Sequence, residues 1–132
     1  MFGYELVGWD LEHLTQLRHL NLCANSLWYS FFTRSLAKLV NLEHLNLSQT
    51  GLRCDDVFDL ISTLQHTPNL KHLDLSYNSI GNKSFCMILS IVERLTKLEH
   101  LVLFGCDIDQ AFRKIILFVT KRENVITFRR NS

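Results

Sequence analysis

The phrase Leu-x-His-Leu-x-Leu occurs four times in this chain and constrains its fold more than any other feature. The four copies begin at Leu17, Leu42, Leu70 and Leu98, so successive copies start 25, 28 and 28 residues apart. A period of roughly 20 to 50 residues predicts a solenoid, in which each repeat stacks on the one before it and buries its apolar side only there.

Each repeat predicts a strand followed by a helix. The leucines of the phrase alternate with other residues, as in a half-buried strand, and the apolar spacing then changes to i, i+3, i+4 and i+7, as in a helix. The predicted buried stripes of three helices are Val57-Leu60-Ile61-Leu64, Phe85-Ile88-Leu89-Val92 and Phe112-Ile115-Ile116-Val119. Asp55 and Ser84 are the expected N-cap residues of two of them. Parallel strands joined by helices wind right-handed. The prediction is therefore an α/β right-handed solenoid, a horseshoe segment with a parallel concave sheet, convex helices and about five helix–strand units.

The whole chain, residues 1–132, is expected to form one domain. Its expected parts are an N-terminal capping helix over residues 1–16, four repeats over 17–108, and a C-terminal helix with a capping strand over 109–132. Near the C-terminus, Val125 and Phe128 are expected to occupy the first two leucine positions of a fifth repeat. Arg130 would then fall where a buried leucine belongs, so the repeat should end there.

These residues resemble the leucine-rich repeat family, whose motif is LxxLxLxx(N/C)xL. Residues 17–27 and 70–80 match it throughout, and Cys106 occupies the Asn/Cys position of the last copy. The second copy departs from the motif, with Thr50 at that position. In the family this side chain bonds to backbone groups of the turn, so the shorter Thr50 is expected to weaken its repeat. The 28-residue period and the helical outer side resemble the ribonuclease-inhibitor-like class, as in the repeat domains of NOD-like receptors. The resemblance implies a domain that binds other proteins on its concave sheet.

The histidines of the phrase predict a ladder along one edge of the concave sheet. His19, His44, His72 and His100 all precede the second leucine, so neighbours should lie about 4.8 Å apart. With Asp74 nearby they could bind a metal, or they could sense pH because stacked imidazoles repel one another once protonated. The alternative is that this position simply tolerates polar residues. We favour that interpretation and predict no metal and no cofactor.

The concave face becomes more apolar toward the C-terminus, which favours a partner-binding surface there. Phe104 lies beside Val102 and is flanked by Tyr77, and aromatic residues of this kind often anchor interfaces. The predicted partner-binding residues are His44, Asn46, Ser48, His72, Asp74, Ser76, Tyr77, His100, Val102 and Phe104. A second exposed apolar patch is expected on the convex helices at Ile91 and Phe118.

The sequence does not favour an enzyme. Cys23 lies near the histidine ladder, but nothing supplies an oxyanion hole, a glycine-rich phosphate loop or a deep pocket. The net charge of +1 gives no general attraction to nucleic acid or to a membrane. The four cysteines are dispersed with no CxxC pair, and the first residues do not resemble a signal peptide. We therefore expect a cytoplasmic protein.

The predicted function is a non-enzymatic protein–protein interaction module that binds a protein partner through the concave sheet, either freestanding or within a larger receptor or regulator. One alternative is a substrate-recognition subunit of an enzyme assembly such as a ubiquitin ligase. A more remote one is a metal- or pH-responsive module that uses the histidine ladder. Copies of the chain could also associate as a homo-oligomer through exposed solenoid ends.

Overall fold

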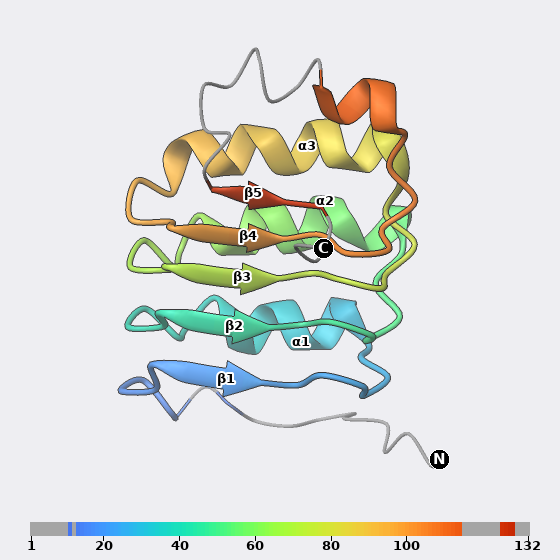
Figure 1. The fold of residues 1–132 in the computed structure, drawn as a ribbon. Coiled ribbons are helices and arrows are strands. Elements are labelled where there is room, and N and C mark those ends of the chain that lie inside the picture. Colours follow the sequence, from blue (N-terminus) through green and yellow to red (C-terminus); the bar gives the residue numbers. More distant parts are fainter. Residues whose placement is uncertain (1–10, 12, 115–124, 129–132) are drawn as a thin grey trace.

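The chain forms one parallel sheet with helices packed on one side of it (Figure 1). The computed structural model describes residues 11, 13–114 and 125–128. In chain order the elements are β1 (His19–Asn21), α1 (Tyr29–Leu36), β2 (His44–Asn46), α2 (Cys54–Leu64), β3 (His72–Asp74), α3 (Gly81–Arg94), β4 (His100–Val102) and β5 (Ile126–Thr127). The strands follow one another in the order β1-β2-β3-β4-β5, and all pairs are parallel. The predicted α/β leucine-rich repeat solenoid is confirmed.

The first four strands are in the register that the repeated phrase predicts. His19 pairs with His44, His44 with His72, and His72 with His100. Every copy of the phrase therefore presents the same position to the same side of the sheet, because successive side chains of a strand point to opposite faces.

The core lies between the sheet and the helices. Leu45, Leu73 and Leu101 are buried on the helix-facing side of their strands. The predicted stripes of α2 and α3 are buried with them, which confirms the helical spacing. In the third stripe Phe112 is half-buried, and its other three members lie outside the described residues. Among the described residues, no helix is long and apolar enough to cross a membrane.

The expected exposed patch on the convex side is wrong for Ile91, which is only 1% exposed. Ile91 belongs to α3, which packs closely against α2, and an interior helix of a solenoid buries a flank as well as its inner stripe. Phe118 lies outside the described residues.

Both expected N-cap residues are also wrong, because the helices begin earlier. Asp55 lies inside the first turn of α2, and Ser84 lies inside α3. At the start of α2, the carboxylate of Asp56 accepts a hydrogen bond of 3.1 Å from the backbone N–H of Arg53. The two aspartates of this first turn also interact favourably with the positive end of the helix dipole.

The described part of the N-terminal segment forms turns. The N–H of Leu14 donates to the carbonyl of Leu11 at 2.9 Å, and that of Leu17 donates to the carbonyl of Leu14 at 3.0 Å. These residues do not form the expected capping helix, whose remaining positions, 1–10 and 12, lie outside the described residues.

The C-terminal capping strand is present, but in a different register from the expected one. Ile126 pairs with Leu101, and Thr127 pairs with Val102. Phe128 therefore aligns with Leu103, two residues away from its expected place. A shift of two residues keeps every side chain on its own face of the sheet, so alternation alone cannot tell the two registers apart. Arg130 lies outside the described residues.

Candidate functional site on the open face of the sheet

The four histidines form a continuous stack on the face of the sheet opposite the helices, which we call the open face. The ring centroids are 4.2 Å apart for His19 and His44, 4.5 Å for His44 and His72, and 4.4 Å for His72 and His100. The angle between neighbouring ring planes grows along the stack from 9° to 16° to 31°. The rings thus follow the strand spacing, as the repeated phrase predicts.

The stack disfavours protonation of His72. The pKa of His72 is lowered from its usual 6.5, first because burial removes water from the ring, and then because His100 and His44 lie on either side of it. A charge on His72 would be repelled by a charge on either neighbour. His72 is therefore predominantly neutral at neutral pH.

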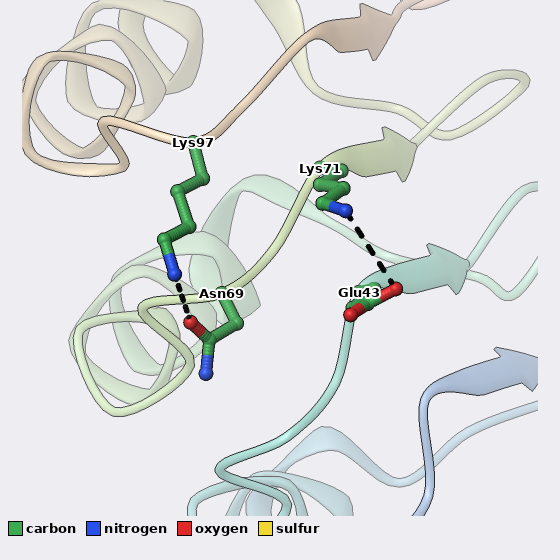
Figure 2. Close-up of polar contacts among 4 residues, drawn as sticks. All are labelled: Glu43, Asn69, Lys71 and Lys97. Carbon is green, nitrogen blue, oxygen red and sulfur yellow. Dashed lines mark hydrogen bonds and ion pairs between the residues drawn. The ribbon is translucent and has the colours of Figure 1, made fainter.

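A row of alternating charge runs beside the histidines. Arg18, Glu43, Lys71 and Glu99 each come directly before a histidine of the ladder. Lys71 Nζ lies 3.9 Å from Glu43 Oε2 in a partly exposed ion pair (Figure 2). A pair this exposed contributes little to stability, roughly 0–1 kcal/mol.

Each charged residue lies beside the histidine that follows it. The reason is that the alternation of side chains between the two faces of the sheet begins only after this pair of residues. The backbone N–H groups of both Glu43 and His44 donate to the carbonyl of Arg18, at 2.8 and 2.9 Å. The next two repeats do the same with the carbonyls of Glu43 and Lys71. Two consecutive N–H groups that share one acceptor point the same way. The acidic or basic residue therefore stays near the imidazole that follows it.

A second row, of side-chain amides, ties together the loops that lead into the strands. Asn41 Nδ2 donates to the carbonyl of Thr15 at 2.8 Å, and Asn69 Nδ2 donates to that of Val40 at 3.2 Å. In the following repeat Lys97 Nζ donates to Asn69 Oδ1 at 2.6 Å (Figure 2). This row was not predicted from the sequence. Its only signal was an asparagine directly before the first leucine of two copies of the phrase.

The open face is hollowed into a groove of about 360 Å³. The groove crosses β1, β2 and β3 and reaches Val102 of β4. Its lining residues are His19, Leu20, Asn21, His44, Leu45, Asn46, His72, Leu73, Asp74 and Val102. Five predicted partner-binding residues therefore meet in one concavity. These are His44, Asn46, His72, Asp74 and Val102.

The outward polar residues of the strands are fixed by their own backbone. Oδ1 of Asn21, Asn46 and Asp74 each accepts a hydrogen bond from the N–H two residues later, at 3.0, 2.9 and 2.9 Å. Val102 has no acceptor to offer at this position. Instead, Ser76 Oγ of the preceding repeat accepts from the N–H of Phe104 at 3.0 Å.

This arrangement corrects the expected exposure of two predicted site residues. Ser76 is 1% exposed because its hydroxyl is turned toward the backbone of the next repeat. Ser48 is also buried, and its Oγ donates to Asn46 Oδ1 at 2.7 Å and lies 3.0 Å from Cys23 Sγ. Both serines shape the open face without presenting their side chains to solvent.

The aromatic residues of the predicted site lie at the edge of the face. Tyr77 is 48% exposed with a positive φ of 57°, and its N–H donates to the carbonyl of Phe104 at 2.6 Å. Its ring covers Gly105 so closely that a Cβ built there would lie 2.7 Å from Tyr77 Cδ1. Phe104 is half-buried and does not line the groove. His100, the last predicted member, is exposed at the end of the ladder.

In the turn that follows β3, the side chain at the Asn/Cys position of the motif makes hydrogen bonds to the backbone. Asn78 Oδ1 accepts from the N–H groups of Thr50 and Leu52 at 3.2 and 3.0 Å, and its Nδ2 donates to the carbonyls of Leu47 and Leu75 at 2.9 Å each.

The turn that contains Thr50 is hydrogen-bonded, although the Thr50 side chain is shorter than that of asparagine. Its hydroxyl donates to the carbonyl of Leu47 at 2.6 Å and also contacts Tyr29 Oη at 2.6 Å. The side chain of Asn78, in the next repeat, accepts a hydrogen bond from the backbone N–H of Thr50. The side chains of Tyr29 and Asn78 therefore compensate for the shorter side chain of Thr50.

Two groups of side chains on the open face have the composition of a metal site. They are His19 with Glu43 and His44, and His72 with Glu99 and His100. Within each group, one donor atom from every residue lies within 4.8 Å of the others.

Comparison with known proteins agrees with this architecture. A family profile described as Leucine Rich Repeat matches residues 69–91, which contain β3 and most of α3. Among solved structures, the chain is similar to an internalin from Listeria monocytogenes, with 20% sequence identity and a TM-score of 0.51. That match covers 92% of this chain but only 37% of the internalin, so the chain spans little more than a third of its length. No curated protein matches the sequence significantly. The ribonuclease-inhibitor-like class stays a prediction. The chain therefore has a leucine-rich repeat fold, and residues 69–91 match the family's profile.

Proposed function

We propose that this protein is a non-enzymatic interaction module that binds a protein partner through the open face of its sheet. The observation that carries the proposal is the groove of about 360 Å³ that crosses three strands and combines imidazole, amide and apolar side chains. A partner segment lying in it would meet the same kind of side chain at intervals of one strand spacing. A repeat scaffold suits binding of this kind, because its extended face is built from stacked units.

The rigidity of the face supports this proposal. The leucines between the outward residues are buried in the core, and the outward Asn46 and Asp74 are held by their own backbone. Side chains that are already ordered lose little conformational entropy on binding, which favours affinity. We expect His44, His72 and His100 to contact the partner with these two polar residues.

The apolar end of the face is the proposed anchor. Val102 is half-exposed and lines the groove, and the exposed ring of Tyr77 belongs to the neighbouring repeat. Phe104 extends the same edge. Interfaces concentrate their binding energy in a few apolar or aromatic residues surrounded by polar ones. Val102 is therefore the position where a charge should disturb binding most.

The test is recovery of partners from native cells by the wild-type chain and by two matched variants. Val102→Asp places a carboxylate in the groove, and we expect it to reduce binding by at least about tenfold, the effect of losing roughly 1.4 kcal/mol. Phe58→Asp is the control, because Phe58 is 64% exposed on α2, on the helical side. Equal recovery by both variants, or a greater loss with Phe58→Asp, would contradict the proposed binding face.

We also propose that the protein functions in the cytoplasm. All four cysteines are free thiols, and Cys23, Cys54 and Cys86 are exposed, which suits a reducing compartment. A role as the substrate-recognition subunit of an enzyme assembly would use the same face and stays a prediction. Association through the solenoid ends likewise stays a prediction, and the mass of the chain in solution tests it.

A further inference from the structure

Although the sequence alone did not favour a metal site on the histidine ladder, we propose that the open face binds two divalent ions of the zinc class, one in the triad His19–Glu43–His44 and one in the triad His72–Glu99–His100. Each triad brings two imidazoles from adjacent strands together with the carboxylate that precedes the second of them. One donor atom from each residue lies within 4.8 Å of the other two. Movements of a few tenths of an ångström to about 1 Å bring such donors to the 2.0–2.2 Å bond lengths of zinc.

The placement of the carboxylates follows from the backbone. Glu99 and His100 both donate their N–H groups to the carbonyl of Lys71, and Glu43 and His44 share the carbonyl of Arg18 in the same way. Each glutamate is therefore kept beside the histidine that follows it, although adjacent residues of a regular strand would point to opposite faces.

The alternation of charge before the histidines decides which pairs of neighbouring histidines form a metal site. Acidic residues precede the histidines of the second and fourth strands, whereas Arg18 and Lys71 precede those of the first and third. Each glutamate can be combined with its own histidine and the histidine of the preceding strand. The ladder is thereby divided into two separate triads.

The donor set indicates the class of ion. Two imidazole nitrogens and one carboxylate oxygen suit zinc and similar divalent transition metals, with a fourth position left for water. Calcium and magnesium take mainly oxygen ligands and should not compete.

Metal binding requires the rings to leave their stacked arrangement. In the pair His19–His44 the planes differ by only 9°, so the in-plane lone pairs of the two rings run side by side and do not converge. Rotation about χ2 corrects this, and that torsion is soft for histidine. His72 and His100 are already tilted by 31°, and Glu43 of the other triad is paired with Lys71. We therefore expect the triad of His72, Glu99 and His100 to bind more tightly.

The test is calorimetric titration of the untagged full-length chain with zinc at pH 7.5, with magnesium as the comparison ion. We expect two zinc ions per chain, no magnesium binding, and the absorption spectrum of low-coordinate Co²⁺ when cobalt replaces zinc. Glu99→Gln and Glu43→Gln should each weaken one of the two ions by at least about tenfold, since even residues that only orient a metal ligand cost 10- to 100-fold. The four ligands from the ladder and both glutamates are at least partly exposed, so these variants should fold normally, which circular dichroism checks.

Two exposed residues away from the open face supply matched controls. His66→Ala and Glu93→Gln remove the same chemical groups outside the ladder, and binding should be unchanged. The inference is overturned if zinc does not bind saturably, or if neither ladder glutamate variant weakens it. If only one zinc ion binds per chain, the triad whose glutamate variant leaves zinc binding unchanged is not a metal site. None of these readouts requires the protein partner, so failure here leaves the proposed interaction function standing.

Discussion

Replacement of Asn78 by alanine should be among the most destabilising single changes in this chain. The side chain is 4% exposed and bonds to two repeats at once. Its removal leaves the N–H groups of Thr50 and Leu52 without their acceptor. The carbonyls of Leu47 and Leu75 keep other donors, namely the Thr50 hydroxyl and the Cys106 thiol.

The loss can be estimated from the two orphaned donors. A buried polar group left without a partner costs about 1–3 kcal/mol, so two of them cost about 2–6 kcal/mol. The matched control is Asn25→Ala, at the same position of the first repeat. Asn25 is half-buried and, within the part of the chain that the structure describes, donates to the carbonyls of Leu22 and Cys23 alone, so its removal should cost about 1 kcal/mol or less.

The assay is urea unfolding of the wild type and both variants, followed by circular dichroism. A single domain of this size is stable by about 5–15 kcal/mol, so Asn78→Ala should shift the unfolding midpoint far below that of Asn25→Ala. If the two variants lose stability equally, the bridging role of Asn78 between repeats is refuted.

Three further predictions rest on single groups. Burial raises the pKa of the Cys106 thiol to about 11, so alkylation at pH 8 should label three thiols rapidly and Cys106 slowly; four equally fast thiols would argue against its buried position. The folded chain holds the pKa of His72 below 6.5, so its stabilising contribution is present above that pH and is lost on acidification. The melting temperature should therefore drop between pH 7.5 and pH 5, and drop less in His72→Asn; identical profiles would refute the coupling. Gly105 has a positive φ of 59° and lies under the ring of Tyr77, so Gly105→Ala should cost about 1–2 kcal/mol or more, measured by urea unfolding. Tyr77→Ala in the same chain should recover part of that loss, and no recovery would mean that backbone strain alone is responsible.

Features that repeat could be predicted from the sequence. The leucine phrase predicted the parallel sheet and its register from β1 to β4, because alternation and period together leave one arrangement of stacked strands. The helical stripe beginning at Val57 was buried as predicted for the same reason. The histidine stack followed from the register without further information.

Features that depend on a neighbouring repeat could not be predicted in this way. Ser76 looks like an outward surface residue in its own strand, and only the backbone of Phe104 in the next repeat explains its burial. Thr50 looks like a weak substitute until Tyr29, 21 residues away, is seen to bond to it. The register of β5 was wrong because a shift of two residues preserves the alternation on which the prediction rested.

The most direct test of the proposed binding face is photo-crosslinking in native cells. A photoreactive residue would be placed at position 102, in the groove, or at position 58, on the helical side. Partner adducts should form from position 102 and be absent or much weaker from position 58. Strong adducts from position 58 with none from position 102 would contradict the proposal that the open face of the sheet is the binding surface.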